Sequence, residues 1–184
     1  VLIGDKEVRV QITKIFEEEK IVPQVTMVLA MTKGGKWEEQ IKPLTELGVS
    51  RISPIITGRT EIKQGASFDK KVDKWNKSAI EACKQSGNPW MPQIDSPVSL
   101  ENHLRECKGT LLVAGLAENL NRMPLEATTK EVNILIGPEG GWTEQEEEIL
   151  REKGGKFFSL GRYTLRAETA ALTALAVARS QFLD

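Results

Sequence analysis

The chain has 184 residues, of which 40% are hydrophobic and 28% charged, enough for one sizeable globular domain. It contains no run of about 18 apolar residues, so the sequence predicts no membrane-spanning helix. The net charge of −1 is unevenly distributed: residues 31–90 carry 11 basic and 7 acidic side chains, which makes this segment the candidate for contact with a polyanion, with ordinary scatter of surface charge as the alternative.

Apolar and polar residues alternate over 8–12, which predicts a strand, but the first 22 residues do not fit the rhythm of the rest. From Val25 onward, apolar strands and amphipathic helices alternate with short connections. This pattern predicts an α/β fold with a mostly parallel sheet and helices on both faces. The expected strands cover 25–31, 51–56, 110–116, 132–137 and 156–161, and the expected helices cover 36–47, 69–85 with Asp69 as N-cap, 99–106, 143–153 and 167–182.

Several kinds of chemistry lack the residues they need. The single histidine, His103, leaves no histidine metal cluster, and a Ser-His-Asp triad would have to use it; its surroundings predict a surface helix turn. Neither G-x-G-x-x-G after the first strand nor G-x-x-x-x-G-K-[ST] is present. Cys83 and Cys107 have no metal-like spacing, so we expect buried or semi-buried residues rather than a disulfide, and a reducing, cytoplasmic setting. The start at Val1, without a signal sequence, suggests that N-terminal residues are missing.

A glycine-rich turn, "IGPEGGWTEQEEE" at 136–148, joins a predicted strand to a predicted helix. Thr143 and Glu146 have the spacing of a capping box. Together with Glu144, Glu147 and Glu148, Glu146 crowds the positive end of the helix dipole, where a phosphate would otherwise bind. The loop therefore favours an uncharged or cationic ligand, with a tight turn that holds no ligand as the alternative.

A second loop, "SLGRYTLRAETAA" at 159–171, enters an alanine-rich helix. The alanines permit tight packing against another element or a second subunit. Arg166 and Glu168 stand at the helix entrance, where the dipole disfavours a cation. This placement indicates a functional role for Arg166, with an ion pair to Glu168 or another surface acid as the alternative.

These two loops, with "KGGKWEEQIKPLTELGVSRISPIITGRTEIK" and "KWNKSAIEACKQSGNPWMPQI" in the same order, closely resemble the ribosomal RNA small-subunit methyltransferase E family, the uracil-N3 methyltransferases of the SPOUT superfamily. The resemblance covers roughly residues 25–182. It implies a SPOUT methyltransferase domain over 23–184 with a deep C-terminal trefoil knot, and a homodimer. Residues 1–22 would be the last strands of a mostly missing N-terminal, PUA-like RNA-binding β-barrel.

The resemblance also implies S-adenosylmethionine as methyl donor, S-adenosylhomocysteine as product, and no metal. S-adenosylmethionine carries a sulfonium cation and no phosphate. This agrees with the glutamates that crowd the amino end of the helix predicted over 143–153. Three loops would bind this donor, through Leu112, Ala114 and Gly115, then Ile136, Gly137, Pro138, Glu139 and Gly140, and finally Leu160, Gly161, Tyr163 and Leu165.

The implied substrate is a uridine of 16S ribosomal RNA, with the assembled small subunit as its expected context. Our hypothesis is that Arg166 stabilises negative charge on a uracil carbonyl oxygen while Glu168 or water takes the N3 proton. The candidate phosphate contacts are Lys33, Lys36, Arg51, Arg59 and Arg166. Two alternatives stay open: a different RNA target, or a non-catalytic RNA-binding or assembly factor with this fold.

Overall fold

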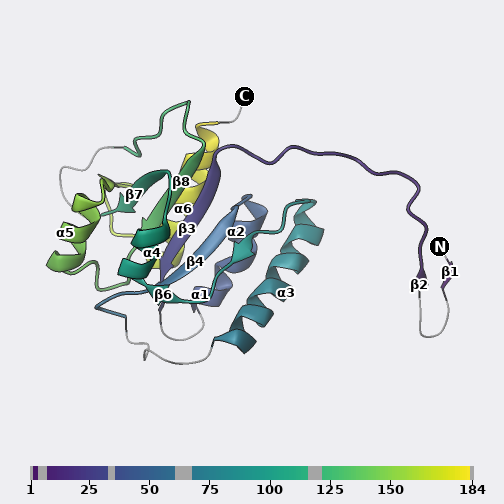
Figure 1. The fold of residues 1–184 in the computed structure, drawn as a ribbon, viewed down its shortest axis with the longest axis horizontal. Helices are drawn as coiled ribbons and strands as arrows, with labels where there is room; N and C mark the ends of the chain where they lie inside the picture. Colours follow the sequence, from purple (N-terminus) through teal and green to yellow (C-terminus); the bar gives the residue numbers. More distant parts are fainter. Residues whose placement is uncertain (1, 4–7, 33–35, 61–67, 116–121, 183–184) are drawn as a thin grey trace.

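The computed structural model describes residues 2–3, 8–32, 36–60, 68–115 and 122–182. Its centre is a seven-stranded sheet in the order β5-β4-β3-β8-β7-β9, with β6 also paired to β4 (Figure 1). All of these strand pairs are parallel. The strands are β3 (Gln24–Ala30), β4 (Arg51–Ile56), β5 (Gln93–Ile94), β6 (Val98–Ser99), β7 (Thr110–Ala114), β8 (Glu131–Ile136) and β9 (Lys156–Phe158).

The two faces of the sheet bury separate hydrophobic clusters, which confirms the predicted α/β layering. On one face, Leu29 and Ile134 share a core with residues of α2 (Ile41–Glu46), α3 (Asp69–Ser86) and α6 (Ala167–Ser180). On the other face, Val28 and Leu135 pack with residues of α4 (Leu100–Glu106) and α5 (Glu144–Glu152). Because β3 and β8 are covered on both sides, their sequences are almost continuously apolar.

The helix expected over 36–47 is two short helices, α1 (Lys36–Glu39) and α2, separated at Gln40. Pro43 explains the break: it has no N–H to donate to the carbonyl of Glu39, so one continuous helix would lose a bond there. The chain restarts instead, with Leu44 N–H donating to Gln40 O at 3.0 Å. The predicted cap of α3 is also wrong, because Phe68 is the N-cap and Asp69 already lies in the first turn.

The last helix is anchored to the amino end of the sheet by a buried arginine. The Arg179 guanidinium donates to Pro23 O at 2.6 Å and to Gly48 O. Burial lowers its pKa to about 10. The alanine face of α6 packs against β3, β8 and α2, so the predicted tight packing of these alanines occurs within the chain.

The amino-terminal part is different in character. β1 (Leu2–Ile3) and β2 (Val8–Arg9) pair antiparallel, and residues 10–22 then run without helix or strand (Figure 1). The strand expected over 8–12 is thus limited to Val8–Arg9. The assignment of this segment to a β-barrel stays a prediction.

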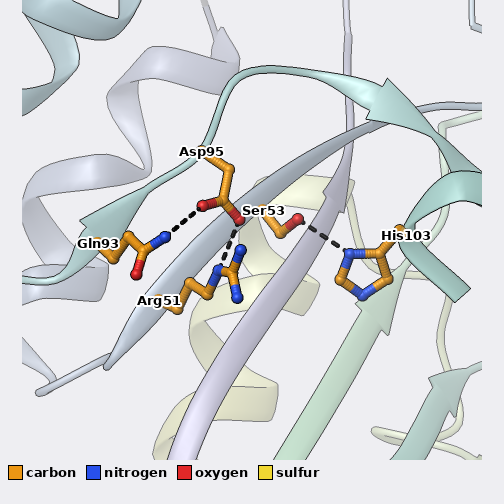
Figure 2. Close-up of polar contacts among 5 residues, drawn as sticks. All are labelled: Arg51, Ser53, Gln93, Asp95 and His103. Atoms are coloured by element: carbon orange, nitrogen blue, oxygen red, sulfur yellow. Dashed lines mark hydrogen bonds and ion pairs between the residues drawn. The ribbon is translucent and has the colours of Figure 1, made fainter. Parts of the chain in front are cut away.

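His103 lies on a helix as predicted, but it is half-buried rather than on the surface, because its ring faces β4 from α4. Its Nδ1 lies 3.1 Å from Ser53 Oγ, while Nε2 is buried without a hydrogen-bond partner among the described residues. Burial is the main cause that lowers the His103 pKa below its usual 6.5, and the charge of Arg51 adds to it. Beside this pair, Arg51 Nε donates to Asp95 Oδ2 at 2.7 Å (Figure 2). These residues form a structural polar cluster, and Ser53, 1% exposed, is closed to substrate.

Candidate active site

Three neighbouring strands, β8, β7 and β9, end at the same edge of the sheet, and the loops that follow them line a cavity of about 930 Å³. Ligand sites of open parallel sheets lie beyond the carboxyl ends of the strands, as this one does. The volume falls within the range of cofactor sites. A fourth segment, the loop after β4, contributes Arg59.

The cavity brings together all of the predicted donor-binding residues except Leu112. Those that line it are Ala114, Gly115, Ile136, Gly137, Pro138, Glu139, Gly140, Leu160, Gly161, Tyr163 and Leu165. Leu112 is fully buried in the core cluster beneath the loops and does not line the cavity. The ends of β7 and β9 are tied together here, because Gly115 N–H donates to Phe158 O at 3.0 Å.

The β8–α5 loop is shaped by Trp142, which sequence reasoning did not single out. Its indole is buried against Gly137: a Cβ on that glycine would lie 3.0 Å from Trp142 Cε2, closer than an unstrained contact. The indole N–H also reaches Ala114 O at 3.4 Å, which links two of the three loops. Gly141 closes the turn, with φ of +72° and its N–H donating to Pro138 O at 2.8 Å.

The predicted capping box at the head of α5 is present. Glu146 N–H donates to Thr143 Oγ1 at 3.2 Å, and Thr143 N–H donates to Glu146 Oε2 at 2.8 Å. The other oxygen of this buried carboxylate accepts from Gly58 N–H at 2.7 Å. Glu146 therefore also clamps the loop after β4 to the head of α5, a long-range role that the spacing did not reveal.

The glutamates near the amino end of α5 have three different surroundings. Glu146 is consumed by the cap and the clamp, Glu147 lines the cavity, and Glu144 and Glu148 face solvent. With Glu139, the cavity wall thus carries two carboxylates. The amino end of α5 is filled by its own side chains, as expected for a loop that does not bind phosphate.

Arg59 belongs to this site, where it donates a hydrogen bond to Gly140 O. The contact is close, since a Cβ on Gly140 would lie 3.2 Å from Arg59 Cδ. The Glu146 clamp holds the residue next to Arg59, so the two contacts fix the loop after β4 against the β8–α5 loop. Charge alone makes Arg59 a candidate phosphate contact, and nothing in the local sequence indicates this packing.

The third wall is the loop between β9 and α6. Gly161 N–H donates to Ser159 Oγ at 3.2 Å, and the Ser159 hydroxyl donates to Gly161 O at 3.0 Å. Arg166 is the N-cap residue of α6, lines the cavity and is exposed. Glu168 is half-buried and does not line the cavity. Both residues are described and no ion pair joins them, so the alternative that Arg166 pairs with Glu168 is not realised; nor does Arg166 pair with another acid among the described residues.

The predicted RNA contacts do not form one group. Arg59 and Arg166 lie at the cavity, whereas Arg51 begins β4 at the opposite edge of the sheet and pairs with Asp95. Lys33 and the side chain of Lys36 lie outside the described residues.

Within the described ranges, no group of His, Cys, Asp and Glu is placed to hold a metal ion, and no helix has the length and apolar character needed to cross a membrane. Cys83 and Cys107 are half-buried free thiols, as predicted.

Fold and site together define a class: the sequence profile of the RNA methyltransferase domain family matches residues 18–179. Among curated relatives, ribosomal RNA small subunit methyltransferase E of Aquifex aeolicus is 33% identical over 94% of this chain and 75% of its own length. Its namesake from Synechocystis sp. is 34% identical over 88% of this chain. The chain therefore belongs to the RNA methyltransferase domain family, and within it to the ribosomal RNA small subunit methyltransferase E family.

Solved structures agree with this assignment. A protein from Legionella pneumophila in complex with the cofactor S-adenosylmethionine superposes with a TM-score of 0.83 at 32% identity, covering 92% of this chain and 71% of that one. Ribosomal RNA small subunit methyltransferase E from Neisseria gonorrhoeae, bound to S-adenosylmethionine, gives a TM-score of 0.78 at 28% identity over 86% of this chain and 66% of that one. The present chain spans only 55% of the length of the Synechocystis relative.

Proposed function

We propose that this chain is an S-adenosylmethionine-dependent methyltransferase that methylates N3 of a uridine in 16S ribosomal RNA. The observation that carries the proposal is the convergence of the three predicted donor loops on one cavity at the carboxyl ends of β7, β8 and β9. The names of the relatives, which specify small-subunit ribosomal RNA, and the donor bound in two similar structures support it.

The cavity suits this donor chemically. Glu139 offers negative charge to a sulfonium cation, as does Glu147, which also accepts from Arg151 at 3.4 Å. The side chains of Ile136, Leu160 and Leu165 offer apolar surface to an adenine ring. Backbone groups of the glycine-rich loop are accessible for hydrogen bonds because Gly137 and Gly140 carry no side chain. When bound, the donor supplies an electrophilic methyl group; the protein positions N3 in line with it, which contributes up to roughly 7–11 kcal/mol.

Uracil N3 carries a proton at neutral pH, so negative charge develops on the base as that proton is lost. N3 then attacks the methyl carbon while the bond from that carbon to the donor sulfur breaks, which discharges the base. We assign Arg166 to stabilise that charge at a carbonyl oxygen, since this residue lines the cavity and its guanidinium has no hydrogen-bond or ion-pair partner among the described residues. Glu168 lies off the cavity wall, which favours water over Glu168 as the proton acceptor.

The finer features of the fold belong to the same proposal. We infer a trefoil knot in the carboxyl-terminal part, a PUA-like barrel to which residues 1–22 contribute, a cytoplasmic location and a homodimer. The buried alanine face of α6 is already used within the chain, so a dimer would use other surfaces. Light scattering at several protein concentrations tests the dimer: a monomer mass throughout would exclude it.

Calorimetry with S-adenosylmethionine tests the donor site, and methylation of small subunits from cells that lack the gene tests the activity. Donor binding with transfer to N3 of a 16S uridine is the expected result. Transfer to another RNA would establish the first alternative. Absence of donor binding would favour the non-catalytic RNA-binding factor instead.

A further inference from the structure

The rim of the cavity carries an unusual exposed aromatic residue, Tyr163, in the loop between β9 and α6. Its side chain is 79% exposed although the residue lines the cavity. Within the described part of the chain, Tyr163 has no hydrogen bond and no ring contact. The ring is therefore presented to solvent at the entrance to the methyl-donor cavity, where core packing cannot explain it.

Two cations flank this ring. Arg162 and Arg166 are exposed, line the same cavity and make no ion pair with any described residue. By contrast, the charged side chains of Lys42 on α2, Lys74 on α3 and Arg51 on β4 are each paired with a carboxylate. The loop thus combines one free aromatic face with two free guanidinium groups in five residues.

This combination matches the chemistry of an unpaired nucleotide. Bases of single-stranded nucleic acids stack on exposed aromatic rings, while neighbouring arginines meet the phosphates. A base whose ring nitrogen is to be modified must be unpaired or leave its stack before it can enter a pocket. A stacking surface at the mouth of the cavity would hold such a base as it enters.

We propose that Arg162 and Tyr163 form a binding site for an unpaired RNA nucleotide, with the Tyr163 ring stacked on a base and Arg162 beside its phosphate, while Arg166 keeps its role at the uracil carbonyl oxygen. The proposal rests on the proposed function in that it takes the substrate to be RNA. It also divides the third loop: the less exposed Leu160 and Leu165 face the methyl donor, and the Tyr163 side chain faces the RNA instead.

The chain contains a single tyrosine, which permits a direct test without mutation. Incorporation of fluorotyrosine places one fluorine reporter at position 163. We expect its NMR resonance to shift when single-stranded oligouridylate is added and to stay nearly unchanged when S-adenosylmethionine alone is added. A shift caused by the donor alone, with none from the oligonucleotide, would overturn the proposal and make Tyr163 part of the donor wall.

Two matched variants at position 163 measure how much the aromatic ring contributes to RNA affinity. Tyr163→Ala should weaken oligouridylate binding by roughly 5- to 100-fold, the effect of losing one stacked base, whereas Tyr163→Phe keeps the ring and should stay within about twofold of wild type. Affinity for S-adenosylmethionine should be unchanged in both. Equal RNA affinity of the alanine and phenylalanine variants would refute stacking.

The two proposals fail in different ways. If wild-type protein bound no S-adenosylmethionine, the proposed function would fail, while the oligouridylate titration would still decide the role of Tyr163. If the donor bound normally and oligouridylate binding were insensitive to the ring at position 163, only the nucleotide site would be wrong. A matched duplex of the same sequence should bind less tightly than the single strand, because its bases are not free to stack on the ring.

Discussion

The Glu146 carboxylate links three parts of the site, and replacing it tests whether this link holds them. One oxygen accepts from Thr143 N–H at 2.8 Å and the other from Gly58 N–H at 2.7 Å, with only 7% of the residue exposed. Each hydrogen bond to a charged group contributes about 1.5–3 kcal/mol. Removing the side chain would let water solvate part of the Thr143 and Gly58 N–H groups, which offsets some of the loss. We therefore expect Glu146→Ala to lower the free energy of unfolding by roughly 2–4 kcal/mol, a figure that includes the loss of the helix cap.

Urea unfolding followed by circular dichroism measures this loss. Glu148→Ala is the matched control: it lies on the same helix, is exposed, and should change stability by less than about 0.5 kcal/mol. Glu146→Gln keeps one acceptor oxygen and should fall between the two. Arg59 lines the cavity and lies in the loop that Glu146 holds through Gly58. Glu146→Gln should therefore also lower the affinity for S-adenosylmethionine. If Glu146→Ala were as stable as the control, the clamp would be wrong.

Three further predictions concern single positions. Gly137→Ala places a methyl group 3.0 Å from the Trp142 ring, so we expect the donor loop to shift and affinity for S-adenosylmethionine, measured by calorimetry, to fall at least ~10-fold; unchanged affinity would contradict the packing described. Arg166→Ala should lower the single-turnover rate at saturating RNA by about 10²–10³-fold with donor affinity unchanged, and a full rate would remove its assigned role. Because the pKa of His103 is lower in the folded chain, the unfolded chain binds more protons below the usual 6.5, and the free energy of unfolding should decrease as pH falls through 6.5. His103→Gln should flatten this pH dependence. The same pH profile of unfolding in wild type and variant would count against the role of His103.

The layers of the fold follow from the sequence, but the order of its strands does not. Apolar runs and helix caps are local signals, and those of β3, β8 and the capping box of α5 were sufficient to place these elements. That β3 lies between β4 and β8 depends on how crossovers pack over the sheet, a long-range property. Pro43 shows a local signal that outweighed periodicity, because a missing N–H interrupts a helix whatever its apolar pattern.

The site shows the same limit. Motifs predict three loops for binding the donor, and the cavity gathers all of the predicted residues but Leu112, which is buried one layer below. Arg59 and Trp142 were missed as wall residues because their positions depend on contacts with segments far away in sequence, Gly140 and Ala114 respectively. Surface charge was a poor guide to function, since it could not separate the paired Arg51 from the free Arg166.

We propose that this cavity delivers a methyl group to uracil N3, and one experiment tests this directly. The most direct measurement incubates the wild-type chain with S-adenosylmethionine and small subunits from cells lacking the gene, then maps the modified nucleoside by mass spectrometry. We expect N3-methyluridine at one position of 16S ribosomal RNA, formed by wild type and by Glu148→Ala. Donor binding without any methylated uridine, or a methyl group on another atom or another RNA, would contradict it.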